Sequence, residues 1–87
     1  MAAYSVRIKR SAIRDLAGIP RQDLERIEYA IDRLAVQAYS GHPLKGDLRG
    51  LRRLRVGDYR VVYEVLKSEL VVLVIRVAHR REVYRRR

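Results

Sequence analysis

The sequence predicts an α+β domain in which two helices pack on one side of a four-stranded sheet. Between residues 11 and 39 the apolar side chains recur at spacings of three and four, which is typical of helices that face a core. From residue 52 onward they alternate or run together, as they do in strands. The predicted order is an N-terminal strand, a two-helix hairpin and a three-stranded antiparallel meander. Residues 1–87 are too few for a second core and are expected to form one domain.

The first half of the chain supplies one strand and both helices. Tyr4 to Ile8 alternates between polar and apolar residues, which predicts a strand. A helix follows, with Ser11 as its predicted N-cap, and Gly18-Ile19-Pro20 ends it. Pro20 then falls in the first turn of a second helix, where proline is best tolerated. The apolar face of this second helix extends to about Tyr39.

Turn and loop residues lead from the helices into the sheet. Ser40 to Pro43 has the composition of a turn, and Leu44 to Gly50 that of a glycine-containing loop. Gly57-Asp58 is a second turn, after which Tyr59 to Leu66 alternates as a strand does. Leu70 to Val77 is almost continuously apolar, as in a strand that is covered on both sides. This last segment is therefore the predicted central strand.

Several arginines lie within the predicted strands rather than beside them. Alternation from residue 53 to residue 56 sends Arg53 and Arg55 to one face of the sheet, and Leu54 and Val56 to the other. The next strand follows after a short turn, so Arg60 could join the first two arginines on a shared surface. Charges at alternate strand positions indicate a surface that is presented to a charged partner.

The positive charge is concentrated in the second half of the chain. The formal net charge is +10, and residues 44–87 contain thirteen of the 20 Lys and Arg residues but five of the 10 Asp and Glu residues. Most of these cations are arginines, whose planar guanidinium groups form paired hydrogen bonds with phosphate or carboxylate. The pattern favours a nucleic-acid partner over a merely solvated basic surface.

Some classes of site are not expected. The chain has no Cys, and its two His residues lack the Cys or clustered carboxylates of a metal site, so neither a metal nor another cofactor is predicted. The longest apolar run is far shorter than the roughly 20 residues of a membrane span, and the first residues do not form an apolar signal-like segment. We therefore expect a cytoplasmic protein without a membrane partner.

Five segments together resemble the RelE branch of the RelE/ParE toxins, over nearly the whole chain. These segments are Arg14-Asp15-Leu16, Ile19-Pro20, Leu44-Lys45-Gly46, Leu54-Arg55-Val56-Gly57-Asp58-Tyr59-Arg60-Val61-Val62-Tyr63 and His79-Arg80-Arg81-Glu82-Val83-Tyr84. The resemblance implies a RelE-like fold and a toxin of a type II toxin–antitoxin pair, which enters the ribosomal A site and cuts mRNA. It also implies a metal-free reaction in which the ribose 2′-hydroxyl attacks the adjacent phosphate.

The resemblance further implies catalytic roles for five residues. Arg53 and Arg55 match the paired basic residues of the family's second strand. Arg60 matches its phosphate-stabilising arginine. Arg80 matches its C-terminal arginine, and Tyr84 matches the tyrosine that stacks on a base or orients the nucleophile. Preoriented guanidinium groups would stabilise the charge that develops on the phosphate oxygens in the transition state.

Further residues are predicted to contact RNA around this site. They are Lys45, Arg49, Arg52, His79, Arg81 and Arg85. Contacts between such cations and phosphates are independent of sequence and weaken with salt. His79 directly follows an apolar strand, a position more typical of a hydrogen-bonding residue than of a catalytic one.

The sequence leaves the proton acceptor of the reaction open. Arginine holds its proton too firmly to act as a base, and here it occupies both positions at which some members of the family carry lysine. Three possibilities remain: a Tyr84 phenolate, a titrating His79, or cleavage through substrate alignment with water as the acceptor. We favour the third, with Tyr84 assisting. The two arginines also allow the protein to be a weak nuclease.

Two other functions and one partner follow from the same residues. A ParE-like toxin that poisons DNA gyrase by binding would share the fold, although that branch generally lacks a C-terminal tyrosine that matches Tyr84. A degenerate member would only bind RNA or its antitoxin. Either kind of toxin implies a cognate antitoxin, predicted to be acidic and amphipathic and to cover apolar grooves around the helices. The free toxin is expected to be monomeric, and two toxin–antitoxin pairs could form a heterotetramer.

Overall fold

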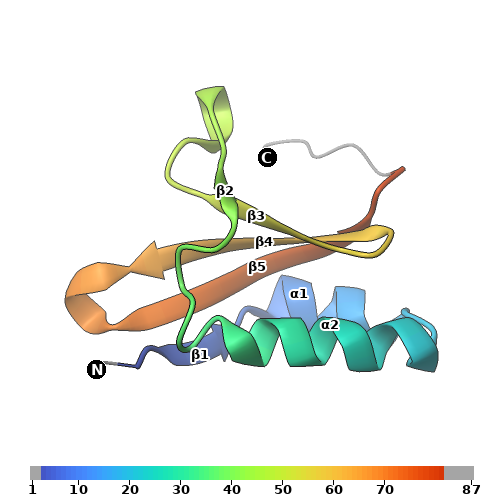
Figure 1. Ribbon diagram of the computed structural model, residues 1–87. Helices are drawn as coiled ribbons and strands as arrows, with labels where there is room; N and C mark the ends of the chain where they lie inside the picture. The colour runs from blue at the N-terminus through green and yellow to red at the C-terminus, as the bar shows by residue number, and fades with distance from the viewer. Residues whose placement is uncertain (1–2, 82–87) are drawn as a thin grey trace.

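The computed structural model describes residues 3–81 and confirms the predicted α+β class. Within this range the chain forms two α-helices, a five-stranded sheet and two short 3-10 turns (Figure 1). The elements are β1 (Ser5–Ile8), α1 (Arg10–Ala17), α2 (Arg21–Arg33), β2 (His42–Pro43), η1 (Gly46–Leu48), β3 (Arg52–Val56), β4 (Tyr59–Leu66), η2 (Lys67–Glu69) and β5 (Val71–His79). Neither helix in the described range is long and apolar enough to cross a membrane.

The strands lie in the order β1-β5-β4-β3-β2. As predicted, β3, β4 and β5 form an antiparallel meander. β1 pairs in parallel with β5, a pairing that the sequence did not specify. The sequence predicted four strands, and the sheet has a fifth, β2, whose His42 and Pro43 pair with Arg53 and Arg52 at the edge of the sheet. Proline is tolerated there because an edge strand need not donate every hydrogen bond. β5 is an interior strand, but the middle position belongs to β4.

Both helices cover the same face of the sheet, as predicted (Figure 1). The core between the two layers contains α2 residues and alternate residues of β4 and β5, including Ile27, Ile31, Val61, Tyr63, Val72 and Val74. Tyr63 is fully buried, and its hydroxyl donates to the carbonyl of Ala38 at 2.8 Å and accepts from the amide of Gly41 at 2.9 Å. Tyr63 is therefore a core residue whose hydroxyl is satisfied both as a donor and as an acceptor.

Both predicted helix boundaries need correction. α1 begins at Arg10 with Lys9 as its N-cap, and no side chain caps it. Ser11 instead donates its hydroxyl to the carbonyl of Ile75 at 2.6 Å, which ties the helix to β5. α2 ends at Arg33 and not near Tyr39.

The early end of α2 has a local cause in the hydrogen bonds that follow it. The amides of Leu34, Ala35 and Val36 bond to carbonyls three residues back rather than four, so the helix tightens into turns. Leu34 and Ala38 are still buried in these turns, at 1% and 4% exposure. The apolar spacing therefore continued beyond the helix, which is why the sequence overestimated its length.

Candidate nucleic-acid interface

The β3–β4 hairpin presents arginines on the face of the sheet that the helices leave open. Arg55 lies directly opposite Arg60, and Arg53 lies opposite Val62. Directly opposed residues of antiparallel strands project from the same face, and the alternate residues project from the other. The alternate pair Leu54 and Val61 packs with the core. Arg53, Arg55 and Arg60 therefore share the open face, as predicted, and we call them the arginine face.

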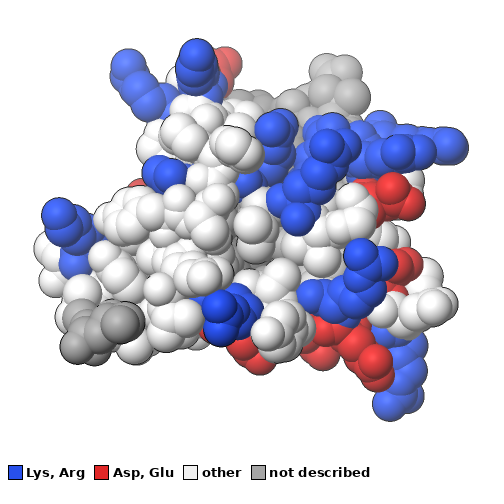
Figure 2. Space-filling view, viewed as in Figure 1, with Lys and Arg blue, Asp and Glu red and all other residues white. Residues whose placement is uncertain are grey.

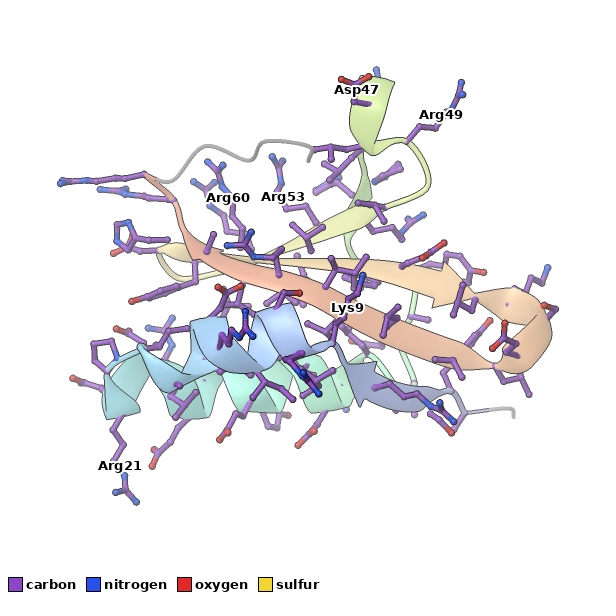
Figure 3. All side chains as sticks on the ribbon, turned by 180° about the vertical axis from the view of Figure 1, so that it is seen from behind. Lys9, Arg21, Asp47, Arg49, Arg53 and Arg60 are labelled. Atoms are coloured by element: carbon purple, nitrogen blue, oxygen red, sulfur yellow. The ribbon has the colours of Figure 1, made fainter. Side chains whose placement is uncertain are left out.

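The orientation of this face can be followed in the side-chain view. Figure 3 shows Arg53 on β3 and Arg60 on β4 pointing to the same side of the sheet, away from both helices. Val62 and Ala78 occupy the neighbouring positions, opposite Arg53 and Arg60 respectively, and both are 3% exposed. The arginine side chains are thus flanked by the apolar side chains of Val62 and Ala78. Arg55 is the most exposed of the three arginines.

Two of these arginines form a like-charge pair. Side chains at directly opposed positions, such as Arg55 and Arg60, have Cβ atoms about 4.5 to 5.5 Å apart, and like charges there destabilise the sheet. An anion that binds to both guanidinium groups would reduce this repulsion and accept their forked hydrogen bonds. The opposed positions of Arg55 and Arg60 therefore suit the binding of a phosphate group.

Arg80 lies at the end of β5, beside the β3–β4 turn. Its backbone amide donates to the carbonyl of Asp58 at 2.6 Å, and its guanidinium group lies 3.7 Å from the Asp58 carboxylate. Ala78 is opposite Arg60, so strand alternation directs Arg80 to the same side of the sheet as the arginine face. Arg81 follows and is exposed. The structure thus brings Arg80 to one end of the arginine face.

His79 lies on the opposite side of the sheet from these arginines. It is directly opposite Tyr59, which packs against the core, and the two rings meet edge to face at 5.3 Å. Nδ1 of His79 accepts a hydrogen bond from the amide of Arg81 at 3.3 Å. These contacts agree with a hydrogen-bonding role and separate His79 from the arginine face.

Arg52 is also directed to the helix side, where it holds a loop. It lies opposite the buried Tyr63, and it donates to the carbonyls of Gly41 and Tyr39, both at 3.1 Å. Its guanidinium group also lies over the Tyr39 ring, 5.1 Å from the centroid. Arg52, predicted to contact RNA, therefore makes contacts within the protein that the sequence did not indicate.

Two further predicted RNA contacts lie beside η1. Lys45 and Arg49 are exposed on either side of η1, and Figure 3 shows Arg49 at the tip of this segment, beyond the open face of the sheet. The predicted RNA contact Arg85 and the predicted catalytic residue Tyr84 lie outside the described residues.

Charge is distributed unequally over the molecule. Figure 2 shows Lys and Arg side chains gathered around the β3–β4 hairpin and the end of β5, whereas many of the acidic side chains lie lower, over the helices. The sequence of α2 alone contributes four of the acidic residues, Asp23, Glu25, Glu28 and Asp32. A field of this kind would orient an approaching polyanion toward the arginine face.

A groove separates α2 from β3, on the helix side of the hairpin. It has a volume of about 560 Å³ and is lined by Glu25, Arg26, Tyr29, Ala30, Leu54, Arg55, Val56 and Gly57. Its floor is largely apolar, and Tyr29 at its border is 67% exposed. The sequence predicted apolar grooves near the helices without locating them, although a tyrosine on the outer side of a helix was a signal for this one. Arg55, a member of the arginine face, also lines this groove.

Comparison with known proteins gives one consistent result. Residues 6–84 match the family model described as the ParE toxin of the type II toxin–antitoxin system parDE. The chain is 35% identical to Toxin RelG of Mycobacterium tuberculosis over 95% of this chain and 98% of that protein. It is 37% identical to Toxin RelE of the same organism over 94% and 87% of the two chains.

A solved structure agrees with these relatives. The toxin–antitoxin complex RelBE2 from Mycobacterium tuberculosis contains a chain that is 32% identical to this protein, with a TM-score of 0.82 over 90% of this chain and 99% of that one. The similarity therefore covers the arrangement of helices and sheet as well as the sequence.

Proposed function

This chain is a RelE-type toxin of the RelE/ParE superfamily of type II toxin–antitoxin systems, and we propose that it is an endoribonuclease that cuts mRNA in the ribosomal A site. The observation that carries the proposal is the arginine face, with Arg55 directly opposite Arg60 and Arg80 held at one end. Its position on the open side of the sheet allows a single RNA strand to approach without displacing the helices.

The proposed reaction is a metal-free transfer within the RNA strand. The 2′ oxygen of the ribose forms a bond to the adjacent phosphorus, and the bond from phosphorus to the 5′ oxygen of the next nucleotide breaks. The 2′-hydroxyl loses its proton and the 5′ oxygen gains one, which leaves a cyclic phosphate and a 5′-hydroxyl. Negative charge grows on the phosphate oxygens between these states, so fixed cations stabilise the transition state more than the substrate.

The arginines would act in this reaction as fixed positive charges and not as bases. A guanidinium group stays protonated at any pH at which the protein works, so Arg55 and Arg60 would bind the non-bridging oxygens throughout. A single preoriented donor of this kind is commonly worth about 3 kcal/mol of transition-state stabilisation. The rest of the rate acceleration would come from alignment of the substrate by the ribosome, with water as the proton acceptor and Tyr84 assisting.

The proposed partner is a cognate antitoxin. The similar chain from Mycobacterium tuberculosis was solved in a toxin–antitoxin complex, which supports the same kind of partner here. A formal net charge of +10 favours an acidic partner, and the apolar floor of the groove between α2 and β3 favours an amphipathic one. Two such pairs could associate as a heterotetramer.

A direct assay tests the nuclease. Purified protein is added to ribosomes that carry a defined mRNA with an empty A site, and the RNA ends are mapped. We expect cuts within the A-site codon that leave 5′-hydroxyl ends, and no cuts in the same mRNA without ribosomes. Intact mRNA after treatment with protein of native circular dichroism spectrum would contradict the proposal.

A second candidate function is favoured by the family model, whose description is that of a ParE toxin. A ParE-like protein would poison DNA gyrase by binding and would stabilise complexes between gyrase and cleaved DNA. Purified gyrase with supercoiled plasmid separates the two functions. Accumulation of linear plasmid in the presence of this protein, together with uncut A-site mRNA, would select the second candidate.

A further inference from the structure

The turn between β3 and β4 and the first residue of β4 contact the end of β5. Strand pairing ends where Tyr59 meets His79, yet the chain stays attached beyond this point. The Arg80 amide donates to the carbonyl of Asp58 at 2.6 Å, and Nη1 of Arg80 lies 3.7 Å from the Asp58 carboxylate. The edge-to-face contact of Tyr59 with His79 adds a packing contact at the same point.

Asp58 is the residue common to the two contacts of Arg80. Gly57 adopts the positive φ of 57° that reverses the chain, and Asp58 follows it at the tip of the hairpin. The backbone carbonyl of Asp58 holds the main chain at Arg80, and its carboxylate lies 3.7 Å from Nη1 of the Arg80 guanidinium group, close enough to favour one direction of this side chain. A flexible arginine side chain loses much rotational freedom when it must adopt one direction, and an ion pair can impose that direction before a substrate binds.

We propose that Asp58 is a positioning residue, which acts through Arg80 to hold its guanidinium group at the end of the arginine face; this inference rests on the proposed nuclease function. Two effects of the Asp58 carboxylate oppose each other. Its negative charge repels RNA phosphates and weakens binding, whereas its contact with Arg80 preorients a cation and accelerates cleavage. The two effects predict opposite results when the charge is removed.

The first test replaces Asp58 with asparagine, which keeps the shape and the backbone carbonyl but removes the charge. Single-turnover cleavage on programmed ribosomes is expected to slow by about tenfold, because small displacements of a catalytic group cost one to two orders of magnitude. The affinity for the ribosome is expected to stay the same or to increase. Cleavage by D58N that is as fast as wild type, or faster, would overturn the proposal.

The second test asks whether Asp58 acts through Arg80. In an Arg80→Ala background, the additional D58N substitution is expected to change cleavage by less than about twofold, because the side chain that it positions is absent. An undiminished tenfold effect in that background would show that Asp58 acts by another route. Glu69→Gln, which neutralises an exposed carboxylate of η2 at the other end of β5, controls for the change in net charge.

A third measurement does not depend on catalysis. The side-chain Nε–H signal of Arg80 in nuclear magnetic resonance spectra is expected to show restricted motion in the wild type and greater motion in D58N, at equal thermal stability. If the wild type leaves A-site mRNA intact, the proposed function fails, and this measurement still decides whether Asp58 orients Arg80. Equal mobility of the Arg80 side chain in both proteins would overturn the positioning role.

Discussion

The two faces of β3 give neighbouring arginines different surroundings. Arg52 points to the helix side, where its guanidinium group is occupied by the carbonyls of Tyr39 and Gly41 and by the Tyr39 ring. Arg53, the next residue, points to the open side and joins Arg60 there. The difference shows that the face of the strand, and not the residue type, separates an arginine that holds the fold from one that can meet a phosphate.

The largest effect is expected from Arg60 on the open face. Arg60→Ala should slow A-site cleavage by about 100-fold, because one preoriented donor to the phosphate is lost. The variant should keep the native circular dichroism spectrum, because Arg60 projects from the open face of the sheet and not into the core between the sheet and the helices. The matched control is Arg21→Ala, whose side chain is 91% exposed on α2 and should cut normally. Equal cleavage by both variants would remove the distinction between the two faces.

The next effect is expected on the helix side, at the buried hydroxyl of Tyr63. Tyr63→Phe leaves the Gly41 amide and the Ala38 carbonyl without this partner, which should lower the free energy of unfolding by about 2 kcal/mol. Urea denaturation measures the change, with Tyr29→Phe as a control that removes an exposed hydroxyl. Cleavage by the folded variant should stay near the wild-type rate. A variant of unchanged stability would mean that water replaces the hydroxyl.

A smaller effect is expected when the neighbouring residues Arg52 and Arg53 are each replaced by alanine and compared. Arg52→Ala should lower the free energy of unfolding by about 1 kcal/mol through its lost bonds to the loop, whereas Arg53→Ala should change it little. Arg53→Ala should slow cleavage more than Arg52→Ala does. Urea denaturation and the ribosome assay on the same two preparations measure both quantities. A smaller loss of stability in Arg52→Ala than in Arg53→Ala, or slower cleavage by Arg52→Ala than by Arg53→Ala, would assign Arg52 to the RNA surface.

The arginine face was predictable because it depends on local alternation alone. A two-residue turn and a period of two were sufficient to place Arg53, Arg55 and Arg60 together, and the register confirms it. The surroundings of Arg52 were not predictable, because they depend on a loop whose path follows from the early end of α2 and from the bond between Gly41 and Tyr63.

His79 illustrates a second limit of the sequence. Its partner Tyr59 follows from the register of β4 with β5, and this register shifts by one residue at an irregularity between Val62 and Tyr63. Such a bulge moves every later residue to the other face of the strand. Alternation from Leu70 onward therefore could not show whether His79 faces the arginines or the core.

The smallest effect is expected at the edge-to-face contact of Tyr4 with Tyr39. A hydrogen bond with the Tyr39 side chain is the main cause that raises the pKa of Tyr4 in the folded protein. The neutral phenol is therefore favoured by folding, so its contribution to stability is complete below the unfolded pKa of 10.0 and is lost as the pH rises through the higher folded value. Tyr4→Phe should flatten the decline in the free energy of unfolding as the pH rises above 10.0. Tyr39→Phe should flatten it in the same way, because it removes the other half of the same bond, and neither variant should alter cleavage at neutral pH. A decline that persists unchanged in both variants would assign the alkaline loss of stability to other groups and would leave this corner of the helix side without a measurable role.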